Sequence, residues 1–160
     1  MSNANSAKVI TIVNLADDMQ YIEEASVCIW EQWHKGIGTQ LDDIIYRTKH
    51  SIFKDRVPQM YIAKCDGEFA GVASIWNNDL MARQDLSPWL ATVIIKEGYR
   101  NMGIGGLLQK KAIQVVKELG YTSLYLVTDH EGYYEKHGWC FVEKAPAGQS
   151  VYKRLYRYDV

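Results

Sequence analysis

The sequence lacks three features that would direct it to common partners. Neither sign of charge dominates, because 18 lysines and arginines accompany 19 aspartates and glutamates and leave a formal net charge of −1. This balance gives no electrostatic case for nucleic acid or an anionic membrane as the main partner. No apolar run approaches the length of a membrane span, and no apolar N-terminal segment suggests secretion. We therefore expect a small-molecule partner and neither nucleic acid nor membrane.

Cysteine is also scarce, with only Cys28, Cys65 and Cys140 in the chain. Their odd number and the absence of C-x-x-C spacing, with no secretory segment, predict a reduced, cytoplasmic location. His130 and His137 precede Cys140, but the H-x6-H-x2-C pattern is not a recognised zinc-ligand spacing. We expect no metal site.

The chain has no repeat, no linker and no shift in composition that would mark a second domain. Its 160 residues are about the length of one domain. Residues 1–8 are polar and low in complexity, and we expect them to be a disordered or expression-derived tail. Residues 9–160 are then expected to form a single domain.

The most informative stretch lies between an apolar run over residues 89–95 and a helical pattern over residues 107–119. It consists of Arg100, Asn101, Met102, Gly103, Ile104, Gly105 and Gly106. The first turn of a helix leaves backbone N–H groups unpaired and carries partial positive charge, so it attracts anions. Glycines let several N–H groups converge on one phosphate, and an arginine adds a cationic fork. The stretch predicts a pyrophosphate-binding loop, with an ordinary turn as the alternative.

Two better-known phosphate motifs do not fit this loop. A dinucleotide fingerprint that starts at Gly103 requires glycine or alanine at position 108, which is Leu108. A P-loop requires Gly-Lys-Ser/Thr, which is absent. The remaining pattern, R-x-x-G-x-G after a strand and before a helix, resembles the acetyl-CoA loop of the GCN5-related N-acetyltransferase (GNAT) family.

A second signature strengthens this resemblance. An apolar run over residues 123–128 precedes the heptapeptide Tyr133-Tyr134-Glu135-Lys136-His137-Gly138-Trp139. This heptapeptide resembles the family's second signature, aromatic-Tyr-Glu-Lys-x-Gly-aromatic, and matches it at every position. Residues 87–95 are similar to the family's central strand, so the matching pieces cover roughly residues 87–142.

The order of predicted elements favours a mixed α/β sheet. An Asp66-Gly67 dipeptide between two apolar runs predicts a hairpin, and Thr128-x-x-Glu131 fits a capping box that would open a helix. The resemblance implies a mostly antiparallel sheet, splayed between the strands that end near Ile95 and Thr128, with helices flanking it. The predicted strands are 9–13, 60–65, 69–76, 89–95, 123–128, 139–144 and 150–157. The other predicted helices are 19–33, whose Trp30 and Trp33 we expect in the core, 41–48 and 107–119.

The resemblance implies transfer of an acetyl group from acetyl-CoA to a primary amine by direct attack in a ternary complex, and we expect the amine to belong to a small molecule. The loop residues 100–106 would hold the pyrophosphate, while Val93 and Ile95 would pair with pantetheine through their backbones. A backbone N–H near Val93 or Ile94 would stabilise the oxyanion. Tyr134 matches the family's general-acid position beside the departing thiolate, and a packed structural aromatic is the alternative.

The general base has no signature in the sequence. Glu31, Asp85, Asp129 and His130 are all candidates. Three other functions stay open: acetylation of a protein or peptide amine, a non-catalytic acyl-CoA sensor, and a dinucleotide-dependent oxidoreductase, which Leu108 disfavours. Dimers are frequent in the family, so a homodimer is also considered.

Overall fold

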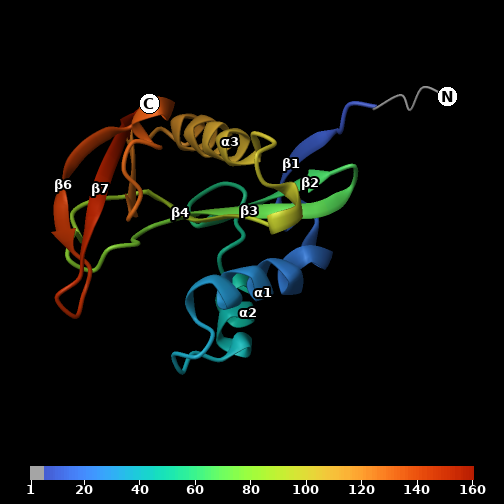
Figure 1. Cartoon of the computed structure of the whole chain (residues 1–160), viewed down its shortest axis with the longest axis horizontal. Coiled ribbons are helices and arrows are strands. Elements are labelled where there is room, and N and C mark those ends of the chain that lie inside the picture. The colour runs from blue at the N-terminus through green and yellow to red at the C-terminus, as the bar shows by residue number, and fades with distance from the viewer. Residues whose placement is uncertain (1–5) are drawn as a thin grey trace.

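A computed structural model describes residues 6–160 and contains a seven-stranded sheet with the strand order β1-β2-β3-β4-β5-β7-β6 (Figure 1). The strands are β1 (Ile10–Asn14), β2 (Gln59–Cys65), β3 (Glu68–Trp76), β4 (Trp89–Ile95), β5 (Ser123–Thr128), β6 (Cys140–Pro146) and β7 (Tyr152–Asp159). The helices are α1 (Ile22–Trp33), α2 (Leu41–Lys49) and α3 (Ile104–Glu118). Most of the tail predicted over residues 1–8 lies outside the described residues, and the domain limits stay a prediction.

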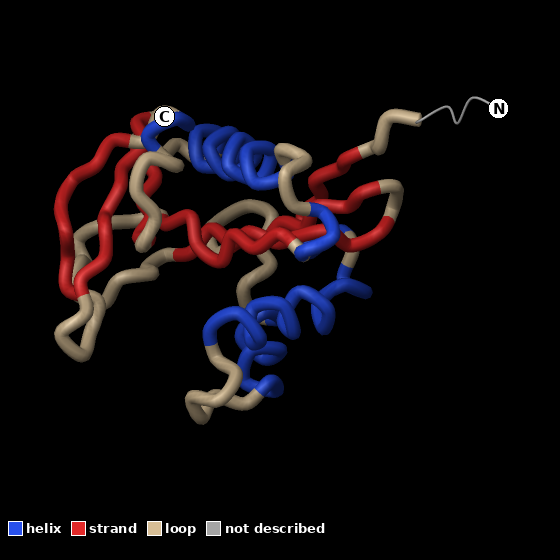
Figure 2. Tube along the Cα trace, viewed as in Figure 1, coloured by secondary structure: helices blue, strands red, loops and turns tan. Residues whose placement is uncertain are grey.

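Helices cover the two faces of the N-terminal part of the sheet (Figure 2). On one face α1 and α2 lie together, and Ala25, Ile29 and Ile44 pack with residues of β2 and β3 in one buried cluster. On the other face α3 places Leu108 and Ala112 in a second, larger cluster. In the described part of the chain, none of these helices combines the length and apolar character that crossing a membrane requires.

The sheet opens between β4 and β5, as predicted. All pairs of neighbouring strands are antiparallel except this one, where β4 and β5 run parallel and only Trp89 pairs with Tyr125. Beyond this pair the strands diverge. A bulge in β4 accompanies the divergence, because the β3–β4 register shifts there and Thr92 has a φ of 50°. A hydrogen bond between the Ser74 and Thr92 hydroxyls fastens the bulge to β3.

Several local predictions are confirmed. Asp66 and Gly67 join β2 to β3 with φ values of 51° and 87°, the positive values that a tight hairpin turn requires. Gly120 follows α3 with a φ of 87°, as expected of a C-terminal cap. The helix itself begins earlier than predicted, because residues 104–106, including two glycines, are already helical.

The helix predicted to open at Thr128 is absent, so that prediction is wrong. The Thr128 hydroxyl accepts a hydrogen bond from the His130 amide at 3.1 Å, but Glu131 pairs with Arg154 of β7 at 3.5 Å instead of returning to the Thr128 backbone. Only one 3-10 turn follows, over Glu135–His137. Trp33 was also predicted in the core, and it is 43% exposed at the end of α1.

Candidate active site

Two hollows open where β4 leaves β5. The loop hollow, of about 850 Å³, lies against the start of α3, and the sheet hollow, of about 950 Å³, lies over the diverging ends of β4 and β5. They share Gln32, Val93 and His130 in their linings. The two hollows therefore meet beside the bulge of β4, where the backbone is locally released from the sheet.

The loop hollow contains the predicted phosphate loop. Asn101 and Gly103 have φ values of 61° and 78°, and Gly103 is the N-cap of α3, so the unpaired N–H groups of the first helical turn face this end of the loop. The Arg100 side chain donates to the Ile95 carbonyl at 3.2 Å. The predicted residues that line the hollow are Val93, Ile94, Ile95, Arg100, Asn101, Gly103, Ile104, Gly105 and Gly106. Met102 does not line it, and its side chain packs against the core.

Two further basic side chains line the loop hollow, Lys110 and His137. Sequence reasoning did not assign them to this site. Lys110 lies seven residues after Gly103, a spacing that returns to the same face of a helix, and could have been found from it. A helix N-terminus with Arg100 and Lys110 beside it suits a ligand with a diphosphate.

The tyrosine pair divides between the two hollows. Tyr133 lines the loop hollow and Tyr134 lines the sheet hollow, with ring centroids 5.0 Å apart and planes at 86°. A Cβ on Gly105 would lie 3.1 Å from the Tyr133 hydroxyl, so glycine leaves room for this ring. The pair therefore marks the junction between the hollows.

The rest of the second signature holds the tyrosine pair in place. Glu135 lines neither hollow and accepts a hydrogen bond from the Tyr156 hydroxyl at 2.5 Å. Gly138 has a φ of 89°, and a Cβ there would approach the Tyr158 ring to 3.1 Å. The Trp139 indole is buried and donates to Gln109 of α3 at 3.0 Å. These contacts give a structural reason for the glutamate, glycine and final aromatic residue.

Tyr134 is held among aromatic rings. Its ring meets that of Trp139 nearly edge to face, with centroids 6.0 Å apart. Burial raises the pKa of Tyr134 to about 12, and the nearby Tyr133 contributes to the shift. The phenol therefore stays protonated at neutral pH and can donate a hydrogen bond into the sheet hollow.

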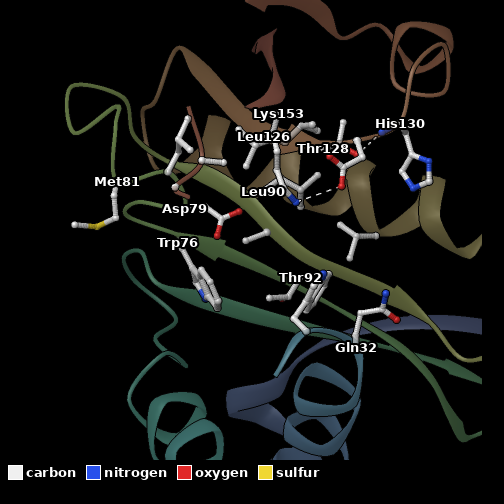
Figure 3. A pocket seen from close by; sticks show the side chains of 18 of the residues that line it. Gln32, Trp76, Asp79, Met81, Leu90, Thr92, Leu126, Thr128, His130 and Lys153 are labelled. Atoms are coloured by element: carbon white, nitrogen blue, oxygen red, sulfur yellow. Dashed lines mark hydrogen bonds and ion pairs between the residues drawn. The ribbon is translucent and has the colours of Figure 1, made fainter. Parts of the chain in front are cut away.

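A carboxylate that sequence reasoning missed lies in the sheet hollow. Asp79, in the connection between β3 and β4, projects into the same space as Trp76 at the end of β3 (Figure 3). Burial raises the pKa of Asp79 to about 6, opposed by the positive charges of Lys153 and Arg47. The connection over residues 77–88 is polar and carries no motif, so nothing in the sequence indicated that this carboxylate is partly buried.

The structure separates the four predicted base candidates. Glu31 and Asp85 line neither hollow, and Asp85 pairs with Arg83 at 2.7 Å. Asp129 lines the sheet hollow but pairs with Lys153 at 3.4 Å, whereas His130 lines both hollows. Among residues 6–160, no group of three histidine, cysteine or acidic side chains is arranged to hold a metal ion.

A splayed sheet with a glycine-rich loop at one side of the gap and a second hollow at the other is the arrangement that the sequence predicts for an acyltransferase. Residues 19–139 match the acetyltransferase (GNAT) family. The chain belongs to this family and is an acyltransferase with a coenzyme A-type cosubstrate. A curated relative, an uncharacterized N-acetyltransferase of Chlorobaculum tepidum, is 30% identical over 64 residues, which are 40% of this chain and 41% of the relative.

Solved structures show the same fold. A GNAT-family acetyltransferase from Staphylococcus aureus superposes with a TM-score of 0.65 at 20% identity, over 94% of this chain and 99% of the other. An aminoglycoside 6'-N-acetyltransferase complexed with coenzyme A has a TM-score of 0.72 at 14% identity, over 94% and 96% of the two chains. At these identities the likeness concerns the fold alone.

Proposed function

We propose that the protein transfers the acetyl group of acetyl-CoA to a primary amine on a small molecule, directly and within a ternary complex. The observation that carries this proposal is the meeting of the two hollows at the β4 bulge. The loop hollow contains the N-terminus of α3 and basic side chains, which suit a diphosphate. The sheet hollow leaves a separate space of about 950 Å³ for an acceptor. Two ligands can therefore approach each other at Val93.

The loop hollow has the residues to hold the cosubstrate, which supplies an acetyl thioester when bound. The first-turn N–H groups of α3, with Arg100 and Lys110, would bind its diphosphate. The free edge of β4 at Val93 and Ile95 would pair with an extended amide-containing chain. An N–H at Val93 or Ile94 would stabilise the negative charge that develops on the reacting carbonyl oxygen.

Tyr134 would donate a hydrogen bond to the leaving group, and Asp79 would accept the proton of the acceptor amine. With a pKa of about 12, the Tyr134 phenol is a weak acid, which favours hydrogen bonding to the departing thiolate over complete proton transfer. Asp79 is ionised above about pH 6, and it would accept the proton that an incoming ammonium group must lose. We propose Asp79 for this step ahead of Asp129, whose carboxylate is already paired with Lys153.

The test is free-thiol release from acetyl-CoA over a panel of small primary amines, with Tyr134→Phe as the diagnostic variant. We expect kcat to fall by about 10- to 1,000-fold, because one hydrogen bond to the leaving thiolate is lost. Acetyl-CoA affinity, measured by isothermal titration, should change little. Tyr152→Phe is the matched control, since Tyr152 is 62% exposed on β7 and lines neither hollow.

The alternatives give different results in the same assay. If acetyl-CoA binds but no small amine causes it to release thiol, the small-molecule proposal is contradicted. A sensor or an acetyltransferase with a peptide acceptor is then favoured. An unchanged kcat in Tyr134→Phe would remove that tyrosine from the mechanism.

A further inference from the structure

The sheet hollow contains an arginine with unused hydrogen-bonding capacity. Arg47 of α2 lines the hollow, and its guanidinium carbon lies 4.7 Å from the centre of the Trp76 ring. Among residues 6–160, this guanidinium has neither a hydrogen bond nor an ion pair, and its Nη2 is buried. Every other arginine of this part of the chain has a polar partner, namely Arg56, Arg83, Arg100, Arg154 and Arg157.

An unpartnered guanidinium in such a position favours an anionic ligand. Burial lowers the pKa of Arg47, but arginine keeps its proton in proteins, so the positive charge remains. A partly buried charge without a counterion is unfavourable, and a carboxylate or phosphate that binds it bidentately relieves this cost. The Trp76 indole N–H beside it is also buried and has no partner among the described residues.

The other charges of the sheet hollow limit what the ligand can be. Lys153 pairs with Asp129 at 3.4 Å, and His34 and His130 also line the hollow. Burial and the neighbouring Arg47 lower the pKa of His34, which favours its neutral form. Arg47 and Asp79 are then the arginine and the carboxylate of the hollow that have no ion-pair partner among the described residues. Arg47 and Asp79 influence each other electrostatically but form no ion pair with one another. The hollow thus presents to a ligand an unpaired guanidinium and an unpaired carboxylate that do not pair with each other.

We infer that the acceptor amine carries an anionic group, a carboxylate or a phosphate, that binds Arg47 while the ammonium end lies toward Asp79. This inference rests on the proposed function and narrows its substrate class to zwitterionic amines such as amino acids. It disfavours polyamines, because a second ammonium group would meet the Arg47 guanidinium.

The experiment compares acceptors that differ in one end group. The carboxylate series runs from glycine to 6-aminohexanoate, the neutral series consists of n-alkylamines of equal length, and the cationic series of α,ω-diamines. Phosphoethanolamine provides the phosphate arm. We expect kcat/KM for the best carboxylate or phosphate acceptor to exceed that of its neutral counterpart by about 10- to 100-fold, with diamines lowest.

Variants at Arg47 test whether this residue binds the anionic group of the acceptor. In Arg47→Met the preference for the anionic acceptor over its neutral counterpart should disappear, mainly through a higher KM for the anionic acceptor. Arg47→Lys should retain part of the preference, because it keeps the charge without the planar fork. Arg56→Met is the matched control: Arg56 also stacks on an aromatic ring, that of Phe53 at 3.9 Å, but lies outside both hollows. Circular dichroism and acetyl-CoA titration confirm that each variant is folded.

A binding measurement separates failure of this inference from failure of the proposed function. Each ω-amino acid, alkylamine and phosphoethanolamine is titrated calorimetrically into the protein, alone and saturated with coenzyme A. Tighter binding of an anionic member that is lost in Arg47→Met supports the inference even if no thiol is released. Equal binding of the series, or equal or better turnover of neutral amines or diamines, overturns the inference. Acyl transfer to an amine then stands wherever an amine of any series releases thiol from acetyl-CoA.

Discussion

At the scale of single residues, Asp79 should make the free energy of unfolding depend on pH. Its pKa is about 6 in the folded protein against an ordinary value of 3.8, so between these values the folded state holds a proton that the unfolded state has lost. The contribution of Asp79 to stability is therefore full below pH 4 and decreases as the pH rises through 6. Asp79→Asn should remove this decrease and become more stable than the wild type by about 1–3 kcal/mol at pH 8.

Urea unfolding of wild type and Asp79→Asn at pH 4, 5, 6, 7 and 8 measures this difference directly. Taking the difference at each pH largely cancels the titration of groups that both proteins share, such as His34, which also lines the sheet hollow. A stability difference that does not change with pH would mean that Asp79 is not withdrawn from water. In the same variant, thiol release should be reduced if Asp79 accepts the ammonium proton.

Residues whose role depends on a local pattern could be predicted from the sequence. Gly103 and the tyrosine pair belong to motifs in which neighbouring residues determine the conformation, and the structure places them around the two hollows. Asp79 and Arg47 could not be predicted. Their surroundings are made by tertiary packing between segments distant in the sequence, and a charged residue in a polar loop or on a helix is normally solvated.

At the scale of elements, the approach of β3 to the β4 bulge requires a glycine. A Cβ on Gly71 would lie 2.6 Å from the Ile94 carbonyl oxygen, a backbone atom that can move only with its strand. Gly71→Ala should lower the free energy of unfolding by about 1–3 kcal/mol. It should also weaken acetyl-CoA binding, because displaced Ile94 and Ile95 line the loop hollow.

Chemical denaturation and calorimetric titration of Gly71→Ala provide both values. Gly98→Ala is the control, since a Cβ at Gly98 meets no atom within 4 Å and its φ is not in the positive region. Equal stability and equal affinity in the two variants would refute the close approach of β3 and β4.

The strands and longer helices could be predicted because hydrophobic periodicity reports which face is buried. The segment after β5 could not, although it fits a capping box. Thr128-x-x-Glu131 satisfies the local pattern, but Arg154 on β7 competes for the glutamate, and the following tyrosines are drawn toward Trp139 and α3. Here tertiary contacts outweigh a local signal that stabilises a helix by only about 1 kcal/mol.

At the scale of the whole molecule, ligand binding should raise thermal stability. If acetyl-CoA binds the folded state alone, a concentration 100 times its Kd stabilises that state by about 2.7 kcal/mol. For a chain of this length the shift in Tm should be about 5–10 °C. NAD at the same concentration is the control and should cause no shift, because Leu108 stands where the dinucleotide motif requires a small residue. Differential scanning calorimetry measures both shifts. A shift in Tm with NAD and none with acetyl-CoA would contradict the prediction that the loop binds acetyl-CoA.

The cytoplasmic location, the homodimer and the single domain over residues 9–160 stay predictions at this scale. None of them affects the assignment to the acetyltransferase (GNAT) family, which rests on residues 19–139.

The small overlap between the two hollows has a consequence for divergence among related enzymes. Within residues 6–160, only Gln32, Val93 and His130 line both hollows, so substitutions at the other lining positions alter one hollow at a time. The end of α1, Arg47 of α2 and the β3–β4 connection line the sheet hollow together with parts of β4 and β5, whereas the loop and α3 line the loop hollow. If the acceptor binds in the sheet hollow as proposed, a lineage can exchange its acceptor through changes around Arg47 and Asp79 while the lining of the loop hollow is inherited intact.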